Sequence, residues 1–286
     1  AWIVEERALR AALLPVAYEA GVVVRGGAPF VGLDWTADEG KLTLGNGDPS
    51  PVALTARLIV GADGIRSWIR EAAGIVAAPK PYGQTAVVAN FACQRAHHGM
   101  ARQWFRSDGG VLAWLPLPER RISMVWSAPD ALAADLLALD PAALCAQVAA
   151  AGDHALGELA LLTPAAAFPL SLLKLPTTIA HRLALVGDAA HGVHPLAGQG
   201  VNLGFGDAQA LATVLAERGP VADVGAPILL ERFARRRAEP VLAMQAVTDG
   251  LVRLFGHDTP WLKSLRNAGL AAVDRIPAVK RILAQP

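Results

Sequence analysis

Residues 183–202 read LALVGDAAHGVHPLAGQGVN, and this run predicts a buried strand that leads into a glycine-rich loop. Gly187 ends the strand, because a residue without a Cβ allows the backbone to turn sharply. Asp188 then lies at the carboxyl end of the strand, where open α/β sheets bind their ligands. Its carboxylate can accept hydrogen bonds from the hydroxyl groups of a sugar, so the turn predicts a ligand-binding edge.

The loop after this turn leads into a helix predicted for residues 202–218. Pro195 stiffens the loop, and Gly198-Gln199-Gly200 leaves the backbone with little side-chain cover. A helix amino terminus carries free N–H groups and about half a positive charge, so it favours anionic or electron-rich ligands. The alternative is an ordinary glycine-rich turn. It is disfavoured because so many positions are specified together over residues 183–208, Asp207 among them.

Residues 58–67, LIVGADGIRS, repeat this pattern earlier in the chain, with an apolar strand, an Ala-Asp-Gly turn and a short helix predicted for 66–73. Taken alone, the run is equally well explained as a tight turn in which Ser67 caps the helix. Its combination with residues 183–202 favours a second ligand-binding turn at Asp63.

The remaining segments predict one α/β domain that is interrupted by a separate sheet. Residues 6–20 form an amphipathic helix that Pro15 should kink or end early. A β-meander is predicted first, ending in the apolar run 58–60, and a β-rich region follows. The predicted strands are 22–24, 30–36, 41–44, 52–60, 85–94, 101–106, 111–117, 121–127 and 168–175. The other predicted helices are 130–151, interrupted at Asp140-Pro141, 231–254, broken at Pro240, and two short segments at the carboxyl end.

The composition excludes several classes of protein. Hydrophobic residues make up 53% of the 286 residues and charged residues 18%, so the chain can bury a large core and is not natively disordered. A net charge of +1 gives no sign of a nucleic-acid-binding protein. Cys93 and Cys145 are too few for a disulfide scaffold or a Cys-x-x-Cys metal site, and we expect buried thiols in a reducing compartment. The longest run without a charge or a histidine, Leu159–Leu173, is shorter than the about 20 apolar residues that span a bilayer.

Together, the two motifs resemble those of the FAD-dependent aromatic hydroxylases, flavin monooxygenases with the p-hydroxybenzoate hydroxylase fold. Gly61-Ala62-Asp63-Gly64-x-x-Ser67 is similar to the fingerprint of the family that contacts FAD and NADPH. Gly187-Asp188 through Asn202 is similar to the fingerprint that binds the ribityl chain and the edge of the flavin ring. Within the family, the chain resembles the ubiquinone-biosynthesis hydroxylases in residues 2–9, 115–117, 168–170, 194–200 and 248–255.

The resemblance implies a mixed α/β fold, in which a Rossmann-like FAD-binding domain (1–80 and 176–255) is interrupted by a β-rich substrate domain (81–175). A helical segment (256–286) ends the chain, and we expect the substrate domain to cover the aromatic ring. The family begins with a βαβ unit that carries Gly-x-Gly-x-x-Gly. This motif is not found here, so we expect that unit to be missing ahead of Ala1. Its loss should uncover residues 58–60 and 183–186, and it leaves FAD binding by this chain alone open.

The resemblance also assigns cofactor contacts. Asp188 is expected to bind the ribityl chain, and the backbone of residues 198–202 is expected to face the flavin ring and stabilise its anion. Asp63 and Arg66 should lie near the diphosphate or the nicotinamide. The full set of expected cofactor contacts is Arg7, Asp63, Gly64, Arg66, Gly187, Asp188, Pro195, Gly198, Gln199, Gly200, Val201 and Asn202. No catalytic side chain and no metal ligand is expected, because the flavin supplies the chemistry.

The implied activity is NAD(P)H-dependent monooxygenation with FAD, in which dioxygen hydroxylates an aromatic ring. The expected substrate is a polyprenyl phenol of ubiquinone biosynthesis. Flavin reduction, epoxidation or halogenation on the same fold stay open, as does a flavin-free assembly subunit of a biosynthetic complex. Other ubiquinone-biosynthesis proteins are candidate partners, and nucleic acid is not. A cytoplasmic location is expected, with peripheral contact with the inner membrane left open.

Several polar groups are expected to be structural or solvated. His97-His98 has no third metal ligand at a suitable spacing and is expected in a solvated loop. His191 and His194 are expected to make structural hydrogen bonds, with a role in orienting substrate or flavin left open for His194. Arg235–Arg237 is expected on a solvated helix face. The basic and apolar segment 262–283 either packs against its own protein or rests on an anionic membrane.

Overall fold

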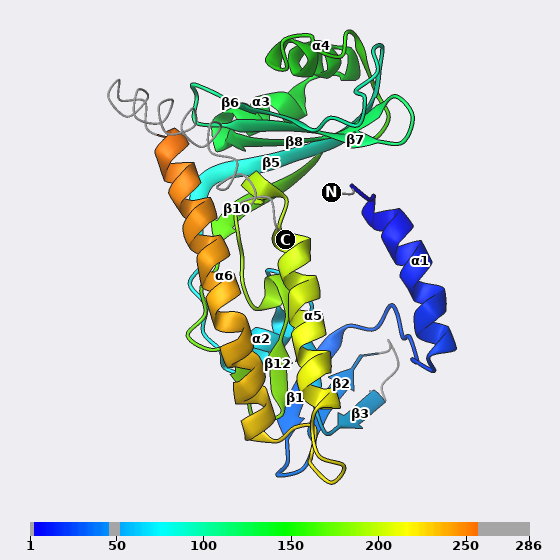
Figure 1. Cartoon of the computed structure of the whole chain (residues 1–286), viewed down its shortest axis with the longest axis vertical. Coiled ribbons are helices and arrows are strands. Elements are labelled where there is room, and N and C mark those ends of the chain that lie inside the picture. Colours follow the sequence, from blue (N-terminus) through cyan, green and yellow to red (C-terminus); the bar gives the residue numbers. More distant parts are fainter. Residues whose placement is uncertain (1–2, 46–51, 257–286) are drawn as a thin grey trace. The chain divides into compact units, whose positions relative to one another are not determined.

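The computed structural model describes residues 3–45 and 52–256. The chain divides into two compact units, the first formed by Ala1–Tyr82 with Leu170–Thr248 and the second by Gly83–Pro169 with Asp249–Pro286. Both units contain strands, and helices lie in both, as Figure 1 shows. The mixed α/β class predicted from the sequence is therefore confirmed.

The first unit is built around a parallel pair of strands, β4 (Ile59–Gly61) and β12 (Leu183–Leu185). The short β11 (Ile179–Ala180) pairs antiparallel with the other side of β12. Leu183 pairs with Ile59, and Leu185 pairs with Gly61. Parallel strands have their carboxyl ends at the same edge of a sheet, so the turns after β4 and β12 leave the sheet at one edge. The two sequence motifs are thereby brought together.

Both faces of β12 are covered. On one face, Ala184 packs with α5 (Gly200–Ala216) and α6 (Pro227–Gly256), which run alongside the strand in Figure 1. Leu183 and Leu185 point the opposite way, because side chains alternate along a strand, and they pack with Ile59 and with α2 (Trp68–Ala72). All three residues of β12 are fully buried, so the expectation that residues 58–60 and 183–186 are both uncovered is wrong for β12, whereas Val60 of β4 is 41% exposed. Local helices and apolar side chains of the chain itself supply the cover.

A second sheet of the first unit is antiparallel and contains β1 (Phe30–Trp35), β2 (Gly40–Leu44) and β3 (Val52–Ala56) in chain order. The meander predicted to continue through residues 58–60 ends at β3, because β4 leaves it to pair with β12. The strand predicted at residues 22–24 is also wrong. Those valines are exposed and have no regular structure, as expected for an extended segment that no neighbouring strand stabilises.

Two helices continue through prolines that were expected to interrupt them. α1 (Glu6–Glu19) runs past Pro15 and has no buried residue. α6 continues through Pro240, although an interior proline removes one helical hydrogen bond. Phe233 and Gln245 are buried on either side of this proline, so tertiary packing holds α6 together where its local sequence favours a break.

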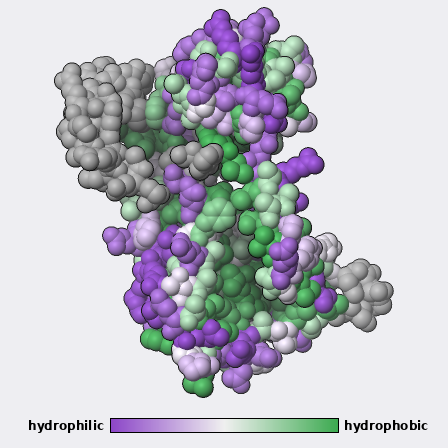
Figure 2. Space-filling view, turned by 45° about the vertical axis from the view of Figure 1, so that its right-hand side comes forward, coloured by the Kyte–Doolittle hydropathy of each residue, from purple (hydrophilic) through white to green (hydrophobic). Residues whose placement is uncertain are grey.

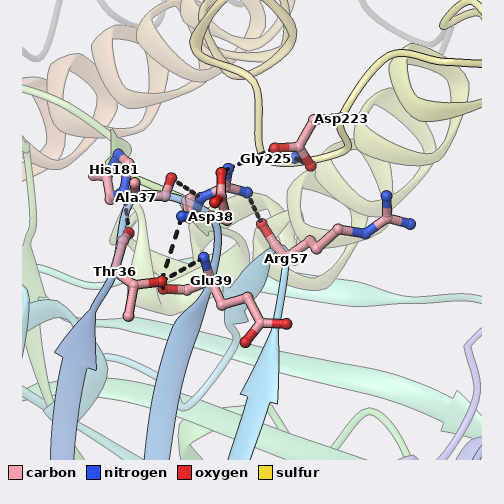
Figure 3. A network of polar contacts seen from close by, with 9 residues as sticks. Thr36, Ala37, Asp38, Glu39, Arg57, His181, Asp223 and Gly225 are labelled. Carbon is pink, nitrogen blue, oxygen red and sulfur yellow. Dashed lines mark hydrogen bonds and ion pairs between the residues drawn. The ribbon is translucent and has the colours of Figure 1, made fainter.

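The amino end of β12 is fixed by Arg182, a buried residue in the left-handed backbone conformation (φ +54°). Its guanidinium donates to the carbonyl of Ala37 at 2.8 Å, the carbonyl of Arg57 at 2.9 Å and the carboxylate of Asp223 at 2.6 Å. Figure 3 shows that the β1–β2 turn, the end of β3 and the loop between α5 and α6 meet at this point. One side chain therefore ties three connections of the first unit to the start of β12.

The second unit is mainly a sheet with the strand order β10-β5-β8-β7-β6, and β9 pairs with β5. Two helices, α3 (Asp130–Ala138) and α4 (Pro141–Ala151), pack their buried residues into the same core as Trp114 and Trp126 of the sheet. Asp140 caps α4 by accepting a hydrogen bond from Ala143 N at 2.9 Å, which confirms the predicted interruption at Asp140-Pro141. The strands are β5 (Lys80–Cys93), β6 (Arg102–Phe105), β7 (Val111–Leu117), β8 (Arg121–Pro129), β9 (Leu159–Leu161) and β10 (Ala166–Leu172).

The histidine pair of the second unit is not simply solvated. His97 is buried, its Nδ1 accepts a hydrogen bond from Gly99 N at 3.0 Å, and its Nε2 lies 3.0 Å from the carbonyl of Leu117. The expectation of a solvated loop is therefore wrong for His97, because these backbone groups satisfy both ring nitrogens; His98 is exposed. The segment 262–283 and the two helices predicted at the carboxyl end lie outside the described residues. None of the helices in the described ranges is both long and apolar enough to cross a bilayer.

Candidate functional site

The turn after β12 is tight and exposes one carboxylate. Gly187 adopts a left-handed conformation (φ +58°), and the N–H groups of Ala190 and His191 donate to its carbonyl at 2.9 and 3.0 Å. These bonds close a single 3-10 turn over Gly187–Ala189. Asp188, in the middle of that turn, is exposed. An acceptor thus lies at the carboxyl edge of the parallel strands, where the sequence predicted it.

His194 holds the loop that leads from this turn to α5. It is 1% exposed, and its Nδ1 accepts a hydrogen bond from Leu196 N at 3.2 Å, which caps the short 3-10 turn Pro195–Ala197. Its ring lies edge-on to that of Tyr82, with centroids 5.1 Å apart. Burial lowers the pKa of His194 to about 4, so the ring is neutral near pH 7 and Nδ1 keeps its lone pair. Of the two expected roles, the structural one is therefore observed.

The amino terminus of α5 is free of side-chain caps. Gln199 occupies the cap position without bonding the backbone, its Oε1 accepts instead from Asn202 Nδ2 at 2.8 Å, and the first turn holds no acidic residue. Just before it, Gly198 is left-handed (φ +61°) and has open space where a Cβ would stand. The N–H groups of Gly200, Val201 and Asn202 therefore lie at an open, partly positive helix end.

Apolar side chains lie next to this helix end. Val201 is 63% exposed, and Phe205, one turn further along α5, is 48% exposed. Figure 2 shows hydrophobic side chains gathered on the face of the first unit where α5 lies. A ligand bound at the helix end would meet free N–H donors on one side and apolar surface on the other. This combination suits a flat ring system with a partial negative charge.

The turn after β4 has a different character from the turn after β12. Asp63 turns both carboxylate oxygens toward α2, accepting from Ser67 Oγ at 2.5 Å and from Ile69 N at 3.1 Å. Ser67 in turn accepts from Arg70 N at 3.0 Å, so the cap predicted as the alternative for this motif is present. Gly64 is left-handed (φ +82°), and Arg66 is exposed. The contact of Asp63, Gly64 and Arg66 with a cofactor stays a prediction.

A buried arginine, Arg70, joins the two motifs and was not predicted. Its Nη2 donates to the carbonyl of Ile65 at 3.0 Å and its Nη1 to the carbonyl of Ala189 at 3.1 Å. One guanidinium therefore bridges the loop after β4 and the turn after β12. The available signal in the sequence was an arginine directly after the apolar Ile69 in a short helix, and this position does not identify the partner of the charge.

A second polar cluster lies beneath the Gly187 turn and centres on Asp207 of α5. Its Oδ2 accepts from Gly187 N at 2.8 Å and lies 2.6 Å from His191 Nε2, while its Oδ1 accepts from Arg237 Nε at 2.6 Å. Burial raises the pKa of Asp207, but the hydrogen bond and charge of His191, together with the hydrogen bonds from Arg237 and from Gly187 N, outweigh burial and hold the pKa below its ordinary value. The expectation of a solvated face is wrong for Arg237, whose side chain is 15% exposed, because Asp207 draws it inward.

The remaining expected contact, Arg7, lies exposed on α1, and the structure does not bring it together with the residues above. Its contact with a cofactor also stays a prediction. Among the described residues, no group of three or more His, Cys, Asp or Glu side chains is arranged to hold a metal ion.

Comparison with known proteins places the chain in a family. The family model for the FAD binding domain matches residues 6–248. The ubiquinone hydroxylase UbiL of Rhodospirillum rubrum is 40% identical over 98% of this chain and 65% of its own length. The 3-demethoxyubiquinol 3-hydroxylase of Escherichia coli is 36% identical over 80% of this chain and 58% of its own length. The solved p-nitrophenol 4-monooxygenase PnpA of Pseudomonas putida superposes with a TM-score of 0.78 at 18% identity, covering 98% of this chain and 71% of that structure.

The fold and these matches thus define the class of the chain, an FAD-binding domain. The chain belongs to the FAD binding domain family, and the resemblance to the ubiquinone-biosynthesis hydroxylases drawn from its motifs is confirmed. The chain spans 65% and 58% of the length of these two curated relatives. The residues present fit FAD, because the open amino terminus of α5, the left-handed Gly198 beside it and the exposed Asp188 provide donors, clearance and an acceptor at one edge.

Proposed function

We propose that the protein to which this chain belongs is an FAD-dependent monooxygenase that uses NAD(P)H and dioxygen to hydroxylate an aromatic ring. The observation that carries the proposal is the open amino terminus of α5 beside the exposed Asp188. The ubiquinone-biosynthesis enzymes among the relatives support a polyprenyl phenol as the substrate. In this proposal FAD, when bound, supplies the redox and oxygen-transfer chemistry, and the chain binds and orients it.

The carboxylate of Asp188 would accept hydrogen bonds from hydroxyl groups of the ribityl chain and would so hold the cofactor. The N–H groups of Gly200, Val201 and Asn202 would donate to the flavin ring and would stabilise negative charge on it. A hydrogen bond to a charged group contributes about 1.5–3 kcal/mol. Because these donors are backbone groups held by a helix, they need no rearrangement when the charge appears.

We assign further contacts with the cofactor to Arg66, Arg7 and the apolar side chains next to the helix end. Arg66 is exposed beside the turn after β4 and is free to pair with the diphosphate or with the approaching nicotinamide. Val201 and Phe205 exclude water from the ring edge next to the helix end. Arg7 contacts FAD from α1. The proposed protein works in the cytoplasm with peripheral contact with the inner membrane, because a polyprenyl substrate lies in a bilayer.

The test is the FAD affinity and activity of the intact protein and of Asp188→Ala. The wild-type protein should show the visible absorption bands of a flavin and should oxidise NAD(P)H faster when a polyprenyl phenol is added. Asp188→Ala should bind FAD about 10-fold to 100-fold more weakly, the equivalent of one hydrogen bond to a charged group. The matched control is Asp34→Ala, an exposed aspartate on β1 that should leave FAD affinity unchanged.

Different outcomes separate the alternatives. A protein that binds no flavin would contradict the proposal and favour an assembly subunit. Bound flavin with NAD(P)H oxidation that no phenol stimulates, and with no hydroxylated product, would favour a reductase or another reaction of the fold. Equal FAD affinity in Asp188→Ala and Asp34→Ala would remove Asp188 from the site.

A further inference from the structure

We propose that Asp207 is a positioning residue for the cofactor site, and that Arg237, reaching in from α6, is the partner that holds it in place. This inference rests on the proposed function, because it assigns to these residues the task of fixing two cofactor contacts relative to each other. The contacts are Asp188 on the turn after β12 and the open amino terminus of α5. Neither Asp207 nor Arg237 belongs to the set of expected cofactor contacts.

Asp207 connects α5 to the turn after β12. From within α5, its Oδ2 accepts from the N–H of Gly187, the residue directly before Asp188, at 2.8 Å. The same oxygen lies 2.6 Å from His191 Nε2, three residues beyond Asp188. Asp207 thus binds the turn that carries Asp188 from both sides and attaches it to the helix whose amino terminus faces the flavin.

The backbone of α5 and the backbone of the Gly187 turn approach each other closely. A Cβ added to Gly204 of α5 would stand 3.3 Å from the Cα of Gly187, which is tighter than most side-chain contacts. The turn therefore rests directly on the helix backbone, with no side chain between them. Backbone contact and the Asp207 bond together leave the Gly187 turn little freedom to shift along α5.

Arg237 of α6 binds both Asp207 and the backbone of α5. Its Nε donates to Asp207 Oδ1 at 2.6 Å and its Nη2 to the carbonyl of Leu203 at 3.2 Å. A Cβ added to Gly206 would lie 3.0 Å from the guanidinium, so α5 carries glycine where Arg237 crosses it. α6 thereby contributes one ionic side chain to a site that its backbone does not reach.

The chemistry of the Asp207 cluster is not explained by stability alone. A buried ion pair is often replaced by apolar side chains without loss of stability, so stability by itself does not require a carboxylate at this position. An apolar residue could not accept the N–H of Gly187. The carboxylate of Asp207 therefore holds the Gly187 turn in one orientation relative to α5.

A cavity of about 410 Å³ makes the cluster accessible to experiment. His191, Asp207 and Arg237 contribute to its lining, and so do the exposed residues Lys174 and Arg235. A small cation can therefore reach Asp207 when the guanidinium of Arg237 is removed. This permits chemical rescue, which tests the interaction without another change in the sequence.

The experiment compares Asp207→Asn, Arg237→Ala and Arg237→Lys with the control Arg236→Ala, whose exposed side chain makes only a 3.8 Å surface pair with Glu217. The readouts are FAD affinity of the folded protein and hydrogen exchange of the Gly187 amide. Arg237→Ala should weaken FAD binding about 10-fold to 100-fold and speed exchange at Gly187. Guanidinium chloride at a non-denaturing concentration should partly restore both, and tetramethylammonium chloride should not. Asp207→Asn should show the same losses without rescue, Arg237→Lys should lie between, and Arg236→Ala should behave as wild type.

The outcomes separate this inference from the proposed function. If the folded variants melt earlier but bind FAD and exchange the Gly187 amide as the wild type does, the cluster is merely structural and the inference is wrong. If the wild type binds no flavin, the proposed function fails, whereas Gly187 exchange and its rescue still report whether Arg237 and Asp207 fix the turn. Unchanged exchange in Arg237→Ala would overturn the inference in either case.

Discussion

The two ends of β12 are built in opposite ways. At the amino end, the donors of Arg182 go to the carbonyls of Ala37 and Arg57 and to the carboxylate of Asp223, and three connections close around them. At the carboxyl end, Asp188 is exposed and the first turn of α5 has no side-chain cap. The strand between them is only three residues long and fully buried.

The difference between the two ends of β12 separates the contacts that stabilise the fold from the groups that are available to a ligand. A ligand site needs polar groups without partners, and such groups contribute little to folding until a ligand arrives. The closed amino end supplies stabilising contacts that the exposed Asp188 and the uncapped first turn of α5 lack. We therefore expect substitutions at the amino end to lower stability and those at the carboxyl end to lower binding.

The largest expected effect is at the closed end. Arg182→Met should lower the free energy of unfolding by about 3–5 kcal/mol, because it removes two hydrogen bonds from a buried charged guanidinium to backbone carbonyls, each contributing about 1.5–3 kcal/mol. Urea denaturation measures the change, with Arg232→Met, an exposed surface pair with Glu217, as the control that should lose less than about 1 kcal/mol. FAD affinity per folded molecule should stay near wild type. A stable Arg182→Met protein that binds FAD poorly would contradict the assignment of stability to the amino end of β12 and of binding to its carboxyl end.

A pH-dependent effect of intermediate size is expected at the open end. Burial lowers the pKa of His194 to about 4 from 6.5, so the unfolded chain binds a proton between these values and the folded chain does not. The free energy of unfolding should therefore fall by about 3 kcal/mol as the pH drops from 6.5 to 4, and this part should be absent in His194→Gln. The pKa values of Asp207 and Asp223 are lowered from 3.8, so their contribution is lost only at lower pH. Parallel pH profiles of the two proteins in urea would contradict this assignment.

The smallest effects come from a matched pair of glycines, one at each end. A Cβ at Gly225 would stand 2.2 Å from the carbonyl of Arg57, so Gly225→Ala should cost about 1–3 kcal/mol of overpacking. A Cβ at Gly187 meets nothing closer than 3.9 Å, so Gly187→Ala should cost only about 1–2 kcal/mol for its left-handed backbone. Thermal unfolding compares the two. A larger loss in Gly187→Ala would mean that the open end is packed more tightly than the closed one.

Much of the architecture could be predicted from the sequence. The glycine that ends β12, the uncovered loop before α5 and the Asp140-Pro141 interruption are local signals, because glycine, proline and capping residues act on their own backbone. The proline of α6 misled, since packing overrides local preference in a long helix. Helix α1 also continues past Pro15, but it does so without any buried residue. The assignment of β4 to the parallel pair rather than to the meander required knowing its partner, β12, more than a hundred residues away.

By itself, the sequence determined the two strand-turn-helix motifs, the mixed α/β class and the family, and it predicted the edge of the sheet that we propose for the flavin. These follow from residue type and spacing over about twenty positions. Only the tertiary structure decided that Arg70 bridges the two motifs, that Arg182 closes the start of β12 and that Asp207 and Arg237 meet beneath the Gly187 turn. A charged side chain looks alike in a sequence whether it is solvated or buried. Its role is set by the partner that folding brings within hydrogen-bonding distance.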